Sequence, residues 1–255
     1  MVVLLINIRN SENPILPLGV LYLGTILKNN NINVVIEDIV FEKDENSLYN
    51  KLKVIQPDII GVSFLTTAFL KTKRIVLNIK NICDNKPVFV GGGTHCTVEP
   101  EETLNELGLD FIIRGEGESS FLEFCNNIAN NKKNYESIPG LVYKINSKIV
   151  INPIKSFIEN LDDIPIPDWT LINMKRYLIP PGYIKGVFLK KTLTLLTSRG
   201  CPAKCIFCSS HASFGYKIRR RSIENVIEEI KIAKKRYALD GLFFWMIHLL
   251  LTQTG

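Results

Sequence analysis

The sequence predicts an α/β protein whose N-terminal part is a doubly wound, Rossmann-like parallel sheet. Short apolar runs alternate with amphipathic segments over the first 130 residues. A further apolar run at 192–200 leads directly into three closely spaced cysteines, and a helical pattern over 223–237 follows. Because a strand-then-helix repeat places helices on both faces of a parallel sheet, these observations favour an α/β architecture.

The apolar runs of the first half are continuous, which predicts strands that are buried on both faces. These strands are expected at 2–8, 33–38, 58–63, 87–92 and 110–115. The helices expected between and after them lie near 19–29, 46–54, 67–82, 100–107 and 118–129. The segment 138–156 alternates around Asn146-Ser147 and predicts a β-hairpin. In 159–177 prolines prevent a helix until about Thr170, so an extended strap is expected there.

These patterns divide the chain into a Rossmann-like domain over 1–137, a hairpin and extended linker over 138–191, and a further α/β segment over 192–255. A hydrophobic content of 46% is typical of soluble proteins, and the net charge of +6 does not favour nucleic acid. The chain starts without a basic export signal, and its longest apolar run, 242–251, is too short to span a membrane. We therefore expect a cytoplasmic protein with no membrane partner.

Loops that follow the predicted strands are rich in glycine and hydroxyl groups. In open α/β sheets, ligands bind beyond the carboxyl ends of the strands, where these loops lie. The usual dinucleotide pattern G-x-G-x-x-G does not follow the first strand. The candidate ligand-binding residues are Ser63, Thr66, Gly92, Gly93, Gly115 and Glu116. Ordinary turns would also explain the glycines, and His95 on its own is better explained as a polar loop residue.

Three cysteines near the end of the chain form the sharpest motif. Cys201, Cys205 and Cys208 have the spacing Cys-x3-Cys-x2-Cys. Three thiolates can ligate three irons of a [4Fe–4S] cube and leave the fourth iron open to a substrate. The alternative is zinc, with His211 as the fourth ligand, but four ligands within eleven residues leave little chain to surround a tetrahedral ion. The remaining cysteines are scattered and do not form a disulfide framework.

The segment TSRGCPAKCIFCSS resembles the cluster loop of the radical S-adenosylmethionine superfamily, whose signature is Cys-x3-Cys-x-aromatic-Cys. The likeness extends over nearly the whole chain, toward the cobalamin-binding branch of that superfamily. This branch includes methyltransferases acting on unactivated carbons and the anaerobic cyclase of chlorophyll synthesis. The segments similar to it, in order, are PLGVLYLGTIL, GVSFLTT, VGGGTHCT, IIRGEGESSFLEF, LDDIPIPDW and FGYKIRRRSIENVIEEI.

The resemblance implies that the three cysteines hold a [4Fe–4S] cluster that binds S-adenosylmethionine, with Phe207 near the adenine. It implies that the first domain binds cobalamin through the six loop residues named above, and that 192–255 begins a radical S-adenosylmethionine (β/α) barrel. Such an enzyme cleaves S-adenosylmethionine to a 5′-deoxyadenosyl radical for methyl transfer or cyclisation. The partners would be a small-molecule substrate and an electron donor such as flavodoxin or ferredoxin. The Asp-x-His-x-x-Gly motif of many cobalamin domains does not occur here.

The end of the chain departs from the family pattern. The 64 residues of 192–255 are few for a (β/α) barrel, which needs about 200. Read from the third base of the Phe244 codon, the codons of Trp245 and Met246 with the first two bases of Ile247 spell Leu-Asp-Asp. That resembles the Asp-Asp-x-Phe-Thr segment after the second barrel strand in this family. We therefore expect a frameshifted, truncated product in which His248 has no role.

Three other functions fit parts of the sequence. A chain with an incomplete barrel is expected to be a non-catalytic remnant that still binds cobalamin. Radical methylthiolation of tRNA needs a second cluster in the first domain, and the helical settings of Cys83 and Cys125 fit this poorly. A zinc-stapled interaction module depends on the alternative ligand set described above. The basic run Lys217 to Arg221 is predicted to be a solvated or phosphate-facing loop before Ser222, which can cap the next helix.

Overall fold

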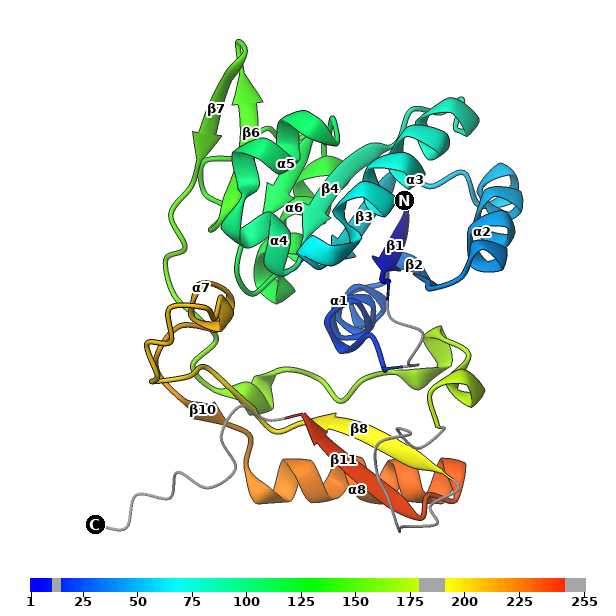
Figure 1. Ribbon diagram of the computed structural model, residues 1–255, viewed down its shortest axis with the longest axis vertical. Helices are drawn as coiled ribbons and strands as arrows, with labels where there is room; N and C mark the ends of the chain where they lie inside the picture. Colours follow the sequence, from blue (N-terminus) through cyan, green and yellow to red (C-terminus); the bar gives the residue numbers. More distant parts are fainter. Residues whose placement is uncertain (11–14, 179–190, 246–255) are drawn as a thin grey trace.

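The computed structural model describes residues 1–10, 15–178 and 191–245. Its first unit is a seven-stranded sheet, and a second, smaller layer lies beside it (Figure 1). The strands of the sheet, in chain order, are β1 (Val2–Ile8), β2 (Asn33–Ile39), β3 (Ile59–Phe64), β4 (Val88–Gly92), β5 (Phe111–Ile113), β6 (Leu141–Ile145) and β7 (Lys148–Ile151).

The strand order is β2-β1-β3-β4-β5-β6-β7, and the first five strands are parallel. This arrangement confirms the predicted doubly wound α/β fold. The chain moves outward in one direction from β1 to β2, and in the opposite direction from β3 to β4, with β3 next to β1. Loops at the carboxyl ends of β1 and β3 therefore diverge, and an open α/β sheet binds its ligand at such a switch point.

Helices cover both faces of the sheet. They are α1 (Leu18–Asn29), α2 (Glu42–Ile55), α3 (Phe69–Ile82), α4 (Thr94–Val98), α5 (Pro100–Glu106) and α6 (Glu118–Ala129). Side chains of α1 and α6, among them Leu21 and Phe124, share one buried cluster, whereas Leu52 of α2 and Ile79 of α3 share the other. The two clusters fill the space above and below the strands, as expected for strands that are apolar on both faces.

The hairpin formed by β6 and β7 belongs to the first sheet. β6 pairs antiparallel with β5, and β7 pairs with β6. Asn146 and Ser147 form the turn, both with positive φ, which confirms the predicted hairpin position. Ile138 and Leu141, at the start of the segment predicted to be a hairpin and linker, are fully buried in the core of the first unit. Backbone pairing with β5 is a long-range feature that the local pattern does not show.

The second layer follows the strap and consists of β8 (Thr192–Leu196), β9 (Ser198–Arg199), α7 (Ser210–Phe214), β10 (Arg219–Arg220), α8 (Ile223–Tyr237) and β11 (Gly241–Trp245). β8 and β11 are parallel neighbours joined through α8, so they form a βαβ unit. Such a unit is how a (β/α) barrel begins. Ser222 caps α8 as predicted, because its hydroxyl accepts from the Asn225 backbone N–H at 3.1 Å.

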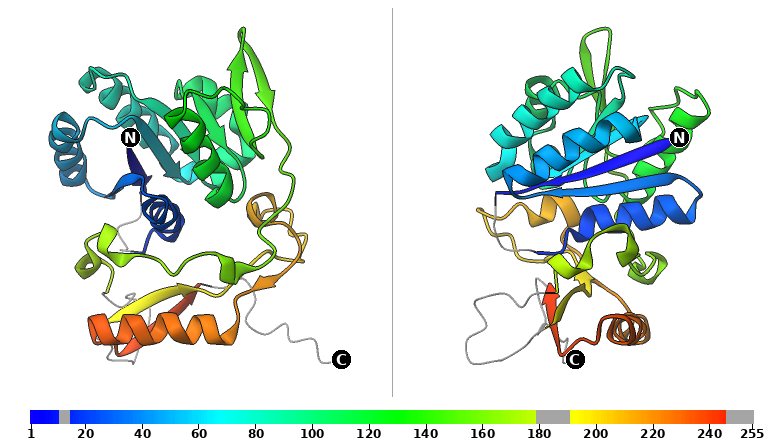
Figure 2. Two further views of the ribbon diagram at one scale, coloured as in Figure 1. Left: turned by 180° about the vertical axis from the view of Figure 1, so that it is seen from behind. Right: turned by 90° about the vertical axis from the view of Figure 1, so that its right-hand side faces the viewer.

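The strap binds the two layers together, as both views in Figure 2 show. It makes three short 3-10 turns, Leu161–Asp163, Trp169–Leu171 and Met174–Arg176. The Tyr177 hydroxyl donates to Asp38 of β2 at 2.7 Å, and the Asp162 carboxylate accepts from the Ser222 backbone N–H at 2.9 Å. The core of the first unit also continues through the strap into the second layer, where it includes Trp169, Met174, Leu193, Leu195 and Ala233.

Two further sequence-based predictions concern the C-terminal residues and membrane-spanning segments. The expected change of reading frame affects residues after Phe244, and His248 with most of the run 242–251 lies outside the described residues. Among the helices within the described ranges, none has the length and apolar character needed to cross a membrane.

Candidate functional site

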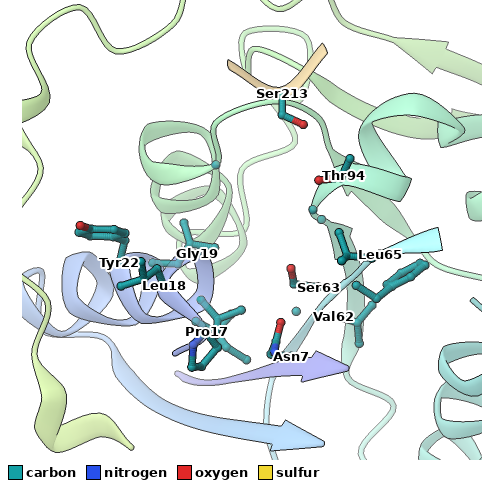
Figure 3. A pocket seen from close by; sticks show the side chains of 18 of the residues that line it. Asn7, Pro17, Leu18, Gly19, Tyr22, Val62, Ser63, Leu65, Thr94 and Ser213 are labelled. Atoms are coloured by element: carbon teal, nitrogen blue, oxygen red, sulfur yellow. The ribbon is translucent and has the colours of Figure 1, made fainter. Parts of the chain in front are cut away.

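A cavity of about 450 Å³ lies at the carboxyl ends of the parallel strands (Figure 3). Asn7 of β1 and Ser63 of β3 line its floor, next to the loops that follow β4 and β5. The start of α1 forms the opposite wall with apolar side chains, including Leu18 and the ring of Tyr22. The cavity therefore occupies the switch point between β1 and β3, with few polar groups on largely apolar walls.

The β4–α4 loop packs closely against the carboxyl end of β3, and this packing requires glycine at position 93. Gly93 has φ +88°, and a Cβ there would lie 2.9 Å from the Ser63 Oγ and 3.1 Å from the Phe64 carbonyl oxygen. Only glycine adopts this conformation easily and leaves the space free. Gly92 has open space where its Cβ would be, since its nearest neighbour is 4.0 Å away. Gly93 thus fixes the loop against β3, and Gly92 lines the cavity with backbone and no side chain.

Replacing Gly93 with alanine is expected to lower the free energy of unfolding by about 1–2 kcal/mol or more, because alanine is strained at this φ and meets the Ser63 Oγ and the Phe64 carbonyl oxygen. Urea denaturation measures the change. Gly19→Ala in α1 is the matched control, since a Cβ at Gly19 would meet no atom within 4 Å. A Gly93→Ala protein that is as stable as the control would contradict this account of the loop.

The structure brings five of the six predicted loop residues to the cavity. These are Ser63, Gly92, Gly93, Gly115 and Glu116. Thr66 does not line it: the residue is exposed in the 3-10 turn Thr66–Ala68, and its Oγ1 lies 3.0 Å from Nδ1 of His95. The next residue, Thr67, lines the cavity instead. Successive side chains of a tight turn point in different directions, so composition alone does not tell which threonine faces the ligand.

His95 is part of the support for the loop rather than of the cavity wall. Its ring is buried and packs against Phe64 and Phe69, at centroid distances of 5.4 and 4.9 Å. Burial lowers the pKa of the imidazole, so the ring is neutral near pH 7. The prediction of a polar loop residue therefore matches its setting only in part, because the side chain is buried.

The cysteine loop follows β9 in the second layer. Gly200, with φ +87°, precedes it, and a Cβ there would lie only 2.0 Å from the Lys217 carbonyl oxygen. Cys201 is buried and its N–H donates to Gly215 at 3.1 Å, whereas Cys205 is exposed and Cys208 is half-buried. The backbone is thus fixed at Cys201, and the next two thiols lie on a loop that is open to solvent.

The donor set of this loop fits a [4Fe–4S] cluster with three protein ligands, because three thiols lie within eight residues and one is held by a rigid strand end. Among the described residues, no three His, Cys, Asp or Glu side chains are already arranged around a metal position. The Phe207 ring, predicted to lie near adenine, is 89% exposed and does not line the cavity. The three cysteines therefore remain predicted cluster ligands, and Phe207 remains a predicted contact of the adenine.

The predicted zinc alternative, with His211 as the fourth ligand, is not tested by the structure. The His211 ring stacks on Tyr216 with a centroid distance of 5.2 Å and an interplanar angle of 9°. Within the described ranges it is not grouped with the cysteines as a metal site. The structure does not test the second cluster that methylthiolation requires. Burial raises the pKa of the Cys125 thiol to about 12.

A buried ion network connects the cysteine loop with the cavity. Arg199, two residues before Cys201, donates to Glu118 at 2.6 Å and to Glu116 at 3.1 Å. Arg219 pairs with Glu116 at 2.8 Å. Arg199 and Arg219 face each other directly across β9 and β10, where like charges repel. Glu116 bonds to both and so offsets this repulsion, while its own side chain is only 3% exposed.

The network also reaches the strap. The Glu116 carboxylate accepts from the Ile158 backbone N–H at 2.7 Å, and Arg219 donates to the Ile158 carbonyl oxygen at 2.7 Å. Burial opposes the charge of Arg199, but the carboxylates of Glu118 and Glu116 outweigh it and raise the pKa of the guanidinium. Glu116 therefore joins three segments of the chain, and its carboxylate oxygens are engaged by them rather than by a ligand.

Two of the four basic residues in the run predicted to be solvated or phosphate-facing are buried, so the prediction was wrong for these two. The Arg219 side chain is 2% exposed in the network, and the Arg221 side chain is 6% exposed and pairs with Glu229 of α8. Lys217 and Arg220 are exposed, as predicted. The partner of Arg219 is Glu116, far away in the chain, and the partner of Arg221 is Glu229, nearly two turns into α8. The sequence run does not reveal such partners.

The cavity wall formed by the second layer was not predicted from the sequence. It consists of Leu196, Arg199, Ser213 and Phe214, which lie on either side of the cysteine loop. Leu18, Gly19 and Tyr22 of α1 were also missed, although their segment follows the first strand at the ligand-binding edge. The cavity is thus lined by both units, and its second-layer residues flank the cysteine loop.

Comparison with known proteins shows what this site is similar to. The family described as B12 binding domain matches residues 4–124. The chain is 34% identical over 229 residues to an uncharacterized methyltransferase of Pyrococcus horikoshii, covering 89% of this chain and 48% of that protein. It is 30% identical over 227 residues to the anaerobic magnesium-protoporphyrin IX monomethyl ester cyclase of Rubrivivax gelatinosus, covering 87% of this chain and 39% of that protein.

A solved structure shares the fold across both units. It is the radical S-adenosylmethionine methyltransferase TsrM from Kitasatospora setae with cobalamin and a [4Fe–4S] cluster bound. The TM-score is 0.72 at 20% identity, and the likeness covers 96% of this chain and 47% of that protein. The chain spans less than half the length of each of these three proteins.

Proposed function

The chain belongs to the cobalamin-binding branch of the radical S-adenosylmethionine proteins, and on this premise we propose that it binds cobalamin in the β1/β3 cavity beside a [4Fe–4S] cluster. Cys201, Cys205 and Cys208 are the proposed cluster ligands. Methyl transfer to a carbon atom of a small-molecule substrate is the proposed reaction, and cyclisation is the alternative that the cyclase relative supports. The observation that carries the proposal is the shared wall: residues flanking the cysteine loop line the cavity.

Some residues would bind the proposed ligand, and others position the cysteine loop. Gly92 and Gly93 let the ligand approach the backbone after β4, and Ser63 offers a hydroxyl from β3. The apolar side chains of α1 exclude water from the opposite wall. Glu116 holds Arg199 and Arg219, and through them the strand end from which the cysteine loop starts. The protein thus fixes the distance between the two cofactors, which themselves supply the difficult chemistry.

When bound, the cluster would supply the electron that cleaves S-adenosylmethionine, and cobalamin would carry the methyl group. We propose a small-molecule substrate, an electron donor such as flavodoxin or ferredoxin, and a cytoplasmic location, where thiols stay reduced. The cavity is largely apolar, and few charged groups around it lack a partner of opposite charge. Both features support a neutral, mostly organic ligand rather than nucleic acid.

The activity test is the formation of 5′-deoxyadenosine from S-adenosylmethionine by anaerobically reconstituted protein with a chemical reductant. The expected result is product that depends on the reductant and disappears in the Cys208→Ala variant. The Cys83→Ala variant is the control, because Cys83 lies at the end of α3, outside the cysteine loop. Product formation that is equal in the Cys208→Ala variant and in the wild type would contradict the proposed role of the loop.

A further inference from the structure

Ser213 is a buried polar residue in the cavity wall to which the proposed reaction assigns no role. It lies in α7, directly after the cysteine loop, and is 6% exposed. Among the described residues its Oγ has no hydrogen-bond partner. A buried hydroxyl without a partner is unfavourable, so such groups in folded proteins usually bond to a ligand or to water.

The two residues that follow Ser213 are held in place by hydrogen bonds to other segments of the second layer. The Gly215 carbonyl oxygen accepts from the Cys201 backbone N–H at 3.1 Å, and the Phe214 carbonyl oxygen accepts from Arg219 at 2.7 Å. The hydroxyl is therefore presented to the cavity by a segment that is fixed before any ligand binds. Pre-organised donors and acceptors of this kind bind a ligand without a further ordering cost.

Three hydroxyl groups of the cavity lie opposite the apolar start of α1. Figure 3 shows Ser63, Thr94 and Ser213 on the side that faces Tyr22 and Leu18 of α1. Arg199 adds a further donor from the second layer: its Nε is buried and, within the described ranges, has no hydrogen-bond partner. Its two terminal nitrogens are bound to Glu116 and Glu118.

The charges around these two groups balance. Arg199 and Arg219 carry two positive charges, and Glu116 and Glu118 carry two negative charges. A wall that offers a hydroxyl and an N–H donor without net charge suits a neutral group with both an acceptor and a donor. A carboxamide has this chemistry, since its carbonyl accepts and its amino group donates. The corrin ring of cobalamin carries several such side chains.

We propose that Ser213 is a cobalamin-binding residue whose Oγ hydrogen-bonds a carboxamide side chain of the corrin. The inference rests on the proposed function and adds to it. The second layer would then bind the cofactor directly, in addition to carrying the cluster. Cobalamin binding thereby becomes a property of both units, linked through α7 and the cysteine loop.

The test is a calorimetric titration of the full chain with cyanocobalamin, whose cyanide ligand limits reaction with the protein thiols. Ser213→Ala is expected to weaken binding about three- to tenfold, the range for one lost hydrogen bond. The same substitution should leave the urea midpoint of the ligand-free protein unchanged or raised, because it removes an unbonded buried hydroxyl. A residue with a purely structural role would show the opposite pattern.

Ser210→Ala is the matched control, since Ser210 lies in the same short helix but does not line the cavity. Equal affinities of wild type, Ser213→Ala and Ser210→Ala would overturn the assignment of Ser213 and leave the proposed function intact. A wild-type chain that does not bind cyanocobalamin would instead overturn the cobalamin part of the proposed function, and the inference with it.

Discussion

Replacing Cys205 with alanine is expected to abolish cluster assembly in anaerobically reconstituted protein. The iron content should fall from about four atoms per chain to below about one, because two thiolates do not replace a three-thiolate site. Cys205 is exposed on its loop, so the substitution removes a proposed ligand without removing buried contacts. The measurement combines iron and sulfide analysis with the visible absorption spectrum.

Cys83→Ala is the control for this experiment, and its iron content should equal that of the wild type. Cys83 caps the end of α3 in the first unit and has no role in the proposed cluster. Full iron content in the Cys205→Ala protein would exclude Cys205 as a ligand. Bound zinc in place of iron, in the wild type, would favour the zinc-stapled module over a radical enzyme.

Replacing Glu116 with alanine is the second change for which we expect a large effect. It leaves Arg199 and Arg219 facing each other across β9 and β10, each almost fully buried and without this shared carboxylate. Removing one partner from a buried ion pair costs about 3–5 kcal/mol, because the remaining charge stays desolvated. We expect a loss of unfolding free energy of this size, measured by urea denaturation of the full chain.

The Glu116→Ala protein should also retain less iron, because the strand end before Cys201 loses its anchor to the first unit. Glu159→Gln is the matched control. Glu159 forms an exposed pair with Lys217, and such pairs contribute little, so no measurable change in stability is expected. If both variants were equally stable, the buried network would not be the contact that holds the two units together.

The sheet of the first unit was predicted well because its strands are continuous apolar runs with helices between them. The predicted strand 2–8 coincides with β1, and the predicted helix 118–129 coincides with α6. The five-residue helix α4 was missed, since it is too short for a helical period and contains three β-branched residues. Local patterns thus identified the long elements and failed for the shortest.

The loops of the candidate site were predicted from the sequence, but the cavity wall contributed by the second layer was not. Ser63, Gly92 and Gly93 were identified because they follow strands that end at the ligand-binding edge. Ser213 and Arg199 reach the same cavity only through packing of the second layer on the first, over more than a hundred residues of chain. Sequence spacing carries no information about such a contact. For the same reason the carboxylate partners of Arg219 were not foreseen.

The central claim is that one site holds both cofactors, and cofactor analysis of a single preparation tests it most directly. The full chain is reconstituted anaerobically with iron, sulfide and hydroxocobalamin, desalted, and analysed for iron, cobalt and zinc. The account predicts about four irons per chain and an equimolar amount of cobalt. Zinc without iron, or iron without cobalt, would contradict the claim that the cysteine loop and the β1/β3 cavity together form a cobalamin and cluster site.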